Sequence, residues 1–450
     1  MQRVAAVNTA GSRPDSLSHG ELPRTLGLAD ALAIVVGIVI GGGIFLVPNL
    51  VARNLGNSTS ILAVWMVAGV VSFFGALACA ELGAAWPATG GQYVFLLRIY
   101  GPMTAFVYGW TMFLVCRTAQ AAWLAVTFTL YVSYFVPLSP IEAKLLGTGA
   151  IVVLGAINYR GVSMGALVQK CFTSAKVIGL LIIIGSAFLW RGSTPVTTAA
   201  AAPFSFSHFG IALIACVLAY DGWVQVTDVA GEMKNPQRNI LLALTFGLGL
   251  CIAIYLTANM AYLHVLGIPG IAASDHVGAS AAERVLGPAG GTLVAVIILV
   301  SIIGALNGCF MTSPRVYFAQ ARSGLFFHRF AEVHPRFRTP AFAILAHGGW
   351  AIVLLLSGSY ETLMDYAMFA FWFFYGLMVL GVMLLRRTQP DLVRPYKMWG
   401  YPVTPLLFLA VTVCFLGNMA IHRPGPSLAA LGFMATGVPV YFWRRKKYGD

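Results

Sequence analysis

Charged residues are scarce in this sequence: they make up 10% of its 450 residues, whereas soluble proteins contain about 25%. Hydrophobic residues make up 59% before glycine is counted. So little polar surface cannot cover a water-soluble globule of this length, and disorder would require low hydrophobicity and high charge. The composition therefore excludes a soluble single-core enzyme and a disordered chain, and it indicates an all-α polytopic membrane protein.

Motifs for enzyme chemistry are also missing. The sequence has no Gly-x-x-x-x-Gly-Lys phosphate loop, no His-Glu-x-x-His and no paired Cys/His ligand spacing, so we expect no enzymatic activity, no metal and no cofactor. All seven cysteines fall inside apolar runs, which predicts small buried residues rather than disulfides. Residues 1–25 have no apolar core, so we expect no signal peptide and insertion directed by the first span.

Apolar runs long enough to cross a bilayer, which takes about 20 residues as a helix, occur twelve times. They are 28–48, 61–85, 102–135, 141–158, 166–190, 208–232, 240–265, 289–313, 341–357, 363–386, 402–421 and 427–443. The loops between them are short, and we interpret the stretch 191–207 as a plain outer linker. We therefore expect one transmembrane domain over 26–443, with a cytosolic tail at 1–25 and a basic cytosolic tail at 444–450.

Lysine and arginine are distributed unevenly between the two sets of loops. Placing the N-terminus in the cytosol puts 21 of the 28 basic residues on the cytosolic side and five outside, with Arg117 and Lys176 inside spans. This bias predicts that both termini lie in the cytosol of a cell that holds the protein in its plasma or inner membrane. The same basic loops account for the net charge of +13. We expect them to meet anionic lipid, and we expect no nucleic acid partner.

Two spans are interrupted near mid-membrane. The first contains Gly41, Gly42 and Gly43 between Ile40 and Ile44, and glycine weakens a helix by about 1 kcal/mol. The sixth contains the run Leu218, Ala219, Tyr220, Asp221, Gly222 and Trp223, where an aspartate is costly in hydrocarbon unless it faces protein or water. Close helix packing is the alternative interpretation of the glycines.

Spans one and six each begin a set of five, and interruptions at matching places indicate an inverted repeat with a site between its halves. The halves would be 28–190 and 208–386, followed by two further helices at 402–443. A weaker echo supports this division, because Arg98-x-x-Gly101-Pro102 precedes span three and Arg284-x-x-Gly287-Pro288 precedes span eight.

The two interruptions have opposite polarity. A half-helix that begins after Gly43 presents unpaired N–H groups and a positive dipole end, which suit a carboxylate. A half-helix that ends near Ala219 presents free carbonyls next to Asp221, which suit an ammonium group. Such a site predicts an α-amino acid as its ligand.

At these residues the sequence resembles the amino acid–polyamine–organocation superfamily, and within it the L-type amino acid transporter branch. Gly41-Gly42-Gly43-Ile44-Phe45 is similar to its Gly-Ser-Gly-Ile-Phe motif. Further similar stretches are Ala219 to Trp223, Glu232-Met233-Lys234-Asn235-Pro236, Ala80-Glu81-Leu82-Gly83, Gly90-Gly91-Gln92-Tyr93, Tyr100-Gly101-Pro102, Ser313-Pro314-Arg315, Ala321-Arg322-Ser323-Gly324 and Arg394-Pro395-Tyr396.

The resemblance implies a LeuT-type fold with 12 transmembrane helices, a 5+5 inverted repeat and two C-terminal helices. It implies a secondary active transporter that moves L-amino acids by alternating access, with sodium-independent exchange as the expected mode. Gly42, Leu218 and Val224 depart from the family pattern, which leaves the substrate open. The loop 136–144 has no cysteine, so no disulfide-linked heavy subunit is expected.

Polar residues inside spans complete the expected site. Gln169, Thr173 and Lys176 share one helical face. The resemblance implies that Lys176 places its ammonium where sodium sits in relatives; a structural lysine bound to a carboxylate or to carbonyls is the alternative. Gln120 is expected in the pocket, and so is Asn307, for which a helix–helix hydrogen bond is equally compatible.

Several alternatives remain open at this stage. Arg117 is expected in a fixed salt bridge, and Asp221 either binds substrate or pairs with Arg117 or Lys176. Glu81 and Glu232 are expected to cap helices or to form gate salt bridges. A proton-coupled amino acid or polyamine/organic-cation symporter and a non-transporting amino acid sensor are the alternative functions, while a channel would need a continuous polar lining.

Overall fold

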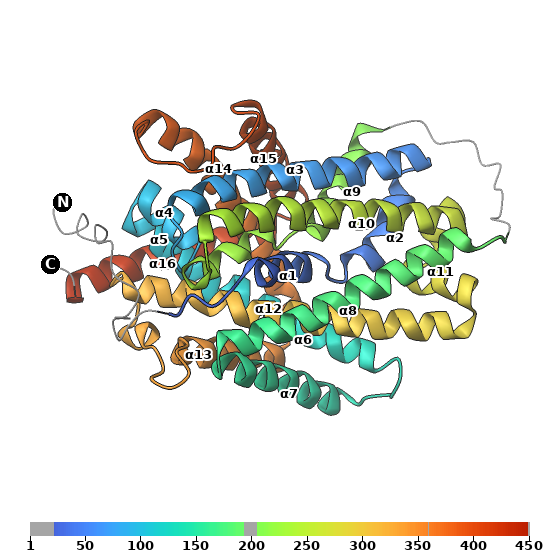
Figure 1. Cartoon of the computed structure of the whole chain (residues 1–450), viewed down its shortest axis with the longest axis horizontal. Helices are drawn as coiled ribbons and strands as arrows, with labels where there is room; N and C mark the ends of the chain where they lie inside the picture. Colours follow the sequence, from blue (N-terminus) through green and yellow to red (C-terminus); the bar gives the residue numbers. More distant parts are fainter. Residues whose placement is uncertain (1–21, 193–204, 359, 449–450) are drawn as a thin grey trace.

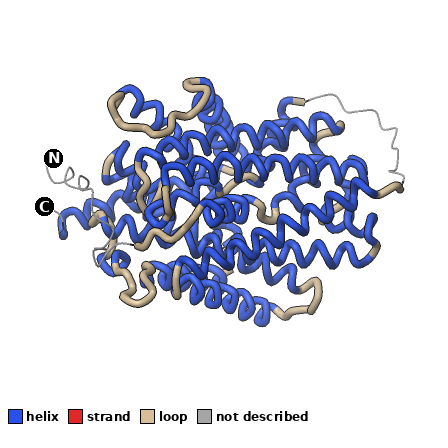
Figure 2. Tube along the Cα trace, in the orientation of Figure 1, coloured by secondary structure: helices blue, strands red, loops and turns tan. Residues whose placement is uncertain are grey.

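Residues 22–192, 205–358 and 360–448 are described by a computed structural model of the chain. These residues form helices joined by mostly short loops, and apart from one isolated bridge between Leu26 and Met233 they contain no β-structure (Figure 2). Most of the expected linker 191–207 and of the N-terminal tail, and the last two residues of the C-terminal tail, lie outside the described residues.

The elements follow one another along the chain in this order: α1 (Leu28–Val39), α2 (Gly43–Asn54), α3 (Ser58–Ala85), α4 (Gln92–Tyr100), α5 (Pro102–Thr111), the π-helix η1 (Met112–Cys116), α6 (Arg117–Val132), α7 (Pro140–Tyr159), α8 (Val162–Leu189), α9 (Phe206–Ala219), the 3₁₀ helix η2 (Trp223–Glu232), α10 (Pro236–Ala273), α11 (Val277–Leu286), α12 (Pro288–Arg322), the 3₁₀ turn η3 (His328–Ala331), α13 (Ala341–Ser357), α14 (Tyr360–Thr388), α15 (Val403–His422) and α16 (Pro424–Tyr448).

Each of the twelve predicted runs coincides with a helix or a broken helix. Among the described residues, 10 helices are long and apolar enough to cross a membrane, or 11 when the bent pair α1 and α2 is one span. The remaining predicted run is the shorter apolar helix α13. The largest differences in length are in α10, which continues to Ala273 past a kink at Gly267 (φ 66°), and in α12, which continues to Arg322.

One local feature, a turn from a short helix into a longer span, recurs in the two halves of the chain. In each half a short helix, α4 or α11, leads into the third long helix through a glycine with positive φ followed by proline. The glycines are Gly101 (φ 88°) and Gly287 (φ 70°). The α4 helix lies near the end of the bundle where the described chain begins and ends, whereas α11 lies near the opposite end (Figure 1). The sequence echo around Arg98 and Arg284 therefore corresponds to an equivalent turn in each half.

We call the end of the bundle that holds Leu26 and Arg444 the terminal end, and the opposite end the distal end. The N–H of Leu26 donates to the carbonyl of Glu232, and Arg444 lies over the ring of Phe327, which places both ends of the described chain there (Figure 1).

The α1 helix lies in the interior and packs against α8, α10 and α12. Its face toward α8 has no room for a side chain at Gly37, because a Cβ there would overlap the side chains of Gln169 and Thr173. These two residues donate hydrogen bonds to the carbonyl of Ala33, at 3.4 and 3.0 Å respectively. The polar face predicted for span five therefore points into the bundle.

All seven cysteines are free. Five are buried as predicted, but Cys171 and Cys414 are exposed, so the expectation of burial is wrong for these two. Cys171 is two residues from both Gln169 and Thr173, and successive helical residues are about 100° apart, so it lies on the opposite face of α8 from the buried polar stripe.

Candidate substrate site

The break in the first span leaves a set of backbone donors free. The α1 helix ends at Val39 and α2 begins at Gly43, with a 40° bend between them. In the described part of the chain, no acceptor faces the N–H groups of Gly42, Gly43 and Ile44, which precede the first intrahelical bonds of α2. Gly41, Gly42 and Gly43 are each partly exposed. This arrangement is the donor end that the sequence predicts.

The opposing carbonyl end of α1 is capped by Lys176. Its Nζ donates to the carbonyl of Gly37 at 2.7 Å, to that of Ile40 at 2.9 Å and to that of Ser301 on α12 at 3.2 Å. The hydroxyl of Ser301 also donates to the Ile40 carbonyl at 2.8 Å. Lys176 is fully buried and makes no ion pair with a described carboxylate. Its ammonium therefore occupies a cage of carbonyl oxygens that joins α1, α8 and α12.

Tyr255 on α10 joins the two broken spans directly. Its hydroxyl lies 2.8 Å from the carbonyl of Val39 and 3.1 Å from that of Ala219, the last residues of α1 and α9. The ring packs against Trp65 and Tyr220 with centroids 5.5 and 4.8 Å away. Sequence reasoning missed this residue, because one tyrosine within an apolar run has no local signal of its role.

The break in the sixth span is a turn followed by a tighter helix. The α9 helix ends at Ala219, Gly222 adopts the left-handed region (φ 112°), and the chain continues as a 3₁₀ helix. Such a long 3₁₀ run is uncommon and marks a hinge or local strain. The carbonyls of Leu218 and Ala219 are already bonded, to the N–H of Asp221 and the hydroxyl of Tyr255. The prediction of free carbonyls at this end is therefore wrong for these two residues.

The carboxyl group of Asp221 has one oxygen, Oδ1, that is buried without a hydrogen-bond partner. It lies within electrostatic range of Tyr375 and Arg117. Asp221 forms no ion pair with Arg117 or with Lys176, because Arg117 pairs with Asp228 and Lys176 with carbonyls. Both alternative partners considered for Asp221 are thus engaged elsewhere.

Arg117 forms the salt bridge predicted for it, but with an acid that the sequence analysis had not singled out. Its Nη2 lies 3.5 Å from Oδ2 of Asp228 on η2, and both side chains are buried. The guanidinium also lies over the ring of Phe371, 5.3 Å from its centroid. Asp228 lies seven residues beyond Asp221, and its burial depends on the packing of η2, which the sequence pattern does not show.

The glycines of the first break differ in the space around them. A Cβ on Gly43 would lie 2.8 Å from Cβ of Ala219, so this glycine lets α2 pack against α9. A Cβ on Gly42 would have no neighbour nearer than Leu46 Cδ1 at 3.9 Å, and one on Gly41 none nearer than the Ile38 carbonyl oxygen at 3.9 Å. Gly42 has an ordinary right-handed conformation (φ −74°), so neither strain nor crowding explains the absence of a side chain there.

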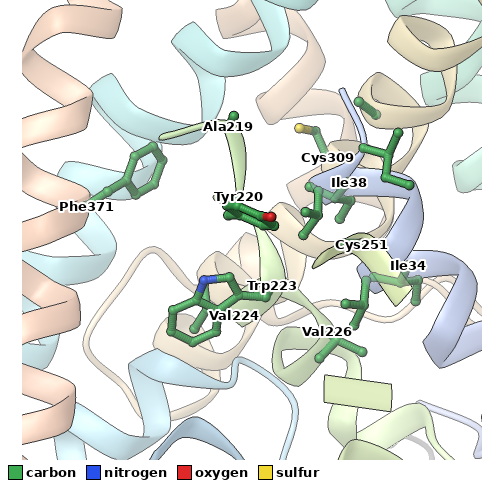
Figure 3. Close-up of a cluster of buried hydrophobic side chains, with 14 of the residues drawn as sticks. Ile34, Ile38, Ala219, Tyr220, Trp223, Val224, Val226, Cys251, Cys309 and Phe371 are labelled. Atoms are coloured by element: carbon green, nitrogen blue, oxygen red, sulfur yellow. The ribbon is translucent and has the colours of Figure 1, made fainter. Parts of the chain in front are cut away.

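The other predicted site residues divide into two groups. Gln120 is partly exposed and its Oε1 has no partner, so it remains available to a ligand. The amide of Asn307 is engaged in bonds between helices: it donates to the Gly165 carbonyl and Gln169 and accepts from Asn158. This geometry supports the helix–helix alternative for Asn307. The side chains of Ile40, Ile44, Tyr220 and Trp223 pack as part of the apolar core. Tyr220 and Trp223 are shown there in Figure 3.

Buried ion pairs close the terminal end below the breaks. Arg315 on α12 donates two hydrogen bonds to Glu232 of η2, from Nε to Oε1 at 2.8 Å and from Nη2 to Oε2 at 3.1 Å. Both side chains are 0% exposed. Glu81 on α3 pairs with Arg386 at 2.6 Å and Arg394 at 3.4 Å. Glu81 and Glu232 are therefore partners in salt bridges, one of the two roles predicted for them.

A membrane bundle with two helices broken at its centre, one offering free backbone N–H groups and the other a free carboxyl oxygen, has the architecture of secondary transporters. The amino acid permease family model matches residues 26–441, and the chain belongs to this family. It is a multi-pass membrane transporter and not an enzyme.

Characterised relatives cover nearly the whole chain. The serine/threonine exchanger SteT of Bacillus subtilis is 33% identical over 429 residues, which are 95% of this chain and 98% of the relative. The human b(0,+)-type amino acid transporter 1 is 33% identical over 94% of this chain and 88% of its own length. The human cystine/glutamate transporter is 31% identical over 96% of this chain and 88% of its own length.

Proposed function

We propose that this protein exchanges L-amino acids across a cell membrane by alternating access and without sodium. The observation that carries the proposal is the polarity of the first break. The carbonyls of Gly37, Val39 and Ile40 are engaged by Lys176, Ser301 and Tyr255. The N–H groups of Gly42, Gly43 and Ile44 have no backbone acceptor among the described residues, and the space beside Gly42 is open. Free donors at a helix N-terminus suit an anion, and here the anion would be the substrate carboxylate.

Asp221 supplies the opposite pole of the proposed site. Its unpartnered oxygen would accept a hydrogen bond from the substrate ammonium, and Gln120 would complete the lining. The remaining predicted contacts, Leu218, Ala219 and Gly222, would form the wall on the side of the sixth span. A buried carboxyl oxygen without a partner is unfavourable, so binding an ammonium there would be stabilising.

Lys176 would take the place of a coupling sodium ion. Its ammonium binds three carbonyls that belong to two spans, which is the kind of oxygen cage that a sodium ion would need. A tethered cation of this kind needs no ion gradient. Transport would then be independent of sodium, which favours exchange over sodium-driven uptake.

Alternating access would require the terminal end to open. The pairs Glu232–Arg315 and Glu81–Arg386 hold η2 and α3 against α12 and α14, so they would have to separate when substrate leaves toward that end. We place the terminal end in the cytosol, because the basic residues are concentrated in the loops on that side. The broken spans would belong to two inverted repeats, residues 28–190 and 208–386, with 402–443 added and α13 counted as the twelfth span.

A flux assay on the purified single chain in proteoliposomes tests this function. Labelled serine and threonine are the first probes, because one relative, which aligns with 95% of this chain, is named as an exchanger of these two amino acids. Uptake that needs an amino acid inside the vesicle indicates exchange. Uptake driven by a pH gradient without internal substrate would indicate proton symport, and binding without flux would indicate a sensor. Flux that begins only after a second subunit is added would contradict the expectation of an independent chain.

A further inference from the structure

A group of buried polar atoms next to the sixth-span break has no hydrogen-bond partner among the described residues. It contains all three guanidinium nitrogens of Arg117 and both carboxyl oxygens of Asp228. Arg117 and Asp228 are 1% and 0% exposed. Buried polar groups are nearly always hydrogen-bonded, so this many free atoms in one place indicates a space that a polar ligand or water fills.

The two buried arginine–carboxylate pairs of η2 differ in geometry. Arg315 and Glu232 form two parallel hydrogen bonds and leave little capacity for anything else. Arg117 and Asp228 are 3.5 Å apart at their nearest atoms and form no hydrogen bond. The first pair is a salt bridge held by two hydrogen bonds. The second retains donors on Arg117 and acceptors on Asp228 that can bond to a third group.

The unsaturated pair lies beside the proposed substrate site. Arg117 is within electrostatic range of Asp221 and lies over the ring of Phe371. Phe371 stacks on Tyr375, whose ring centroid is 5.4 Å from that of Trp223 at the sixth-span break. It follows directly after the π-helix η1, and π-bulges are frequent at functional sites. A substrate whose ammonium meets Asp221 therefore has the Arg117–Asp228 pair within reach of its side chain.

We infer that Arg117 and Asp228 together receive the substrate side chain and select for an uncharged side chain that both donates and accepts hydrogen bonds, such as a hydroxyl or an amide. The inference rests on the proposed function and adds the substrate class.

The selection has two physical causes. The pair has no net charge, so a charged side chain would enter a region where one partner attracts it and the other repels it. An apolar side chain would leave the buried donors and acceptors unpaired, and sites built to bond a polar group reject the apolar isostere strongly. Asp228 is the decisive residue, because it cancels a charge on Arg117 that would otherwise favour anionic side chains.

Uptake of four labelled compounds by the wild-type protein in proteoliposomes is the first test: threonine, its near-isostere valine, aspartate and 2,4-diaminobutyrate. We expect threonine to exceed each of the others by at least about tenfold. Uptake of valine equal to that of threonine would overturn the inference while leaving amino acid exchange intact. No flux of any amino acid would instead refute the proposed function.

Two neutralising variants, of which Asp228→Asn is isosteric, test the charge argument. Asp228→Asn leaves Arg117 uncompensated, so aspartate uptake relative to threonine should rise at least about tenfold, and Arg117→Gln should raise 2,4-diaminobutyrate uptake in the same way. The double variant Arg117→Gln/Asp228→Asn removes both charges and should again prefer threonine.

Glu232→Gln is the matched control. It disrupts the saturated pair four residues further along η2, so it should alter stability or rate while the order of the four compounds stays as in the wild type. An unchanged order in Asp228→Asn or Arg117→Gln would show that the pair is only structural. If one variant yields no folded protein, the other tests the opposite sign of charge, and the comparison of threonine with valine in the wild type is independent of both.

Discussion

The two broken spans differ in which end of the break is available. At the first break the carbonyls are engaged by Lys176, Ser301 and Tyr255, and the N–H groups are free. At the sixth break Ala219 is engaged by Tyr255, and the free group is a side-chain oxygen of Asp221. The first break thus offers backbone donors, while the sixth offers an acidic side chain.

This difference shows how one ligand can be held with its two charged groups on separate spans. Backbone N–H groups do not titrate. A carboxylate can be protonated, and it can also be replaced by mutation. The hydroxyl of Tyr255 lies within hydrogen-bond distance of a carbonyl in each break, so it links the two. The following predictions separate the two breaks, in order of decreasing effect.

Lys176→Met should have the largest effect, because it removes a buried ammonium that donates to three carbonyls, although the Ile40 carbonyl keeps the Ser301 hydroxyl as a donor. Charge-assisted hydrogen bonds contribute about 1.5–3 kcal/mol each, so we expect substrate affinity or folded yield to fall on the order of a hundredfold or more. Uptake and melting temperature are measured together. Lys170→Met on the same helix is the control. Lys170 pairs with Asp30 at 2.9 Å, but its side chain is 41% exposed, so losing this ion pair should change stability and uptake little. Wild-type uptake by Lys176→Met would exclude a role for the ammonium in transport.

Gly42→Ala should weaken substrate binding without destabilising the protein. A methyl group there meets no neighbour within 3.9 Å and suits the backbone conformation, but it enters the space assigned to the carboxylate. Loss of one charge-assisted bond predicts affinity lower by about ten- to a hundredfold.

Gly43→Ala should behave differently from Gly42→Ala. Its methyl group would lie 2.8 Å from Ala219 Cβ, so the melting temperature should fall together with any change in affinity. Gly149→Ala, with no atom within 4 Å, is the neutral control. Normal affinity in Gly42→Ala would remove the carboxylate from this break.

Tyr255→Phe should uncouple the breaks at moderate cost. It leaves the Ala219 carbonyl without its donor and the Val39 carbonyl with the N–H of Gly41, and an unsatisfied buried acceptor lowers the free energy of unfolding by about 1–3 kcal/mol. Tyr262→Phe on the same helix removes a buried hydroxyl that has no partner and should be neutral or slightly stabilising. Equal melting temperatures for the two variants would contradict the bridging role of Tyr255.

Replacing sodium by choline should leave the rate of amino acid exchange unchanged, which is the smallest effect predicted. With Lys176 in the carbonyl cage, no sodium ion is needed between α1 and α12. The initial rate of labelled amino acid exchange is measured in both salts at equal ionic strength. A strict sodium requirement with Lys176 intact would refute the sodium-substitute role.

Much of the architecture was predictable because it depends on local composition. Apolar runs of sufficient length become helices in a membrane, and each predicted run corresponds to a helix or a broken helix. Three glycines within one run and an Asp-Gly pair in another predicted where helices would break, since these residues weaken helices in their own sequence neighbourhood. The polar face with Lys176 followed from helical spacing alone.

The partners of the buried polar residues were decided only by tertiary structure. Lys176 meets carbonyls about 140 residues earlier in the chain, Tyr255 reaches both breaks, and Arg117 pairs with Asp228 rather than with Asp221. Helical periodicity tells which residues share a face, but the neighbour of that face depends on how separate helices pack. Asn307 illustrates the limit: its sequence position fits a pocket or a helix contact equally well, and the packing of α12 against α8 places its amide against Gln169.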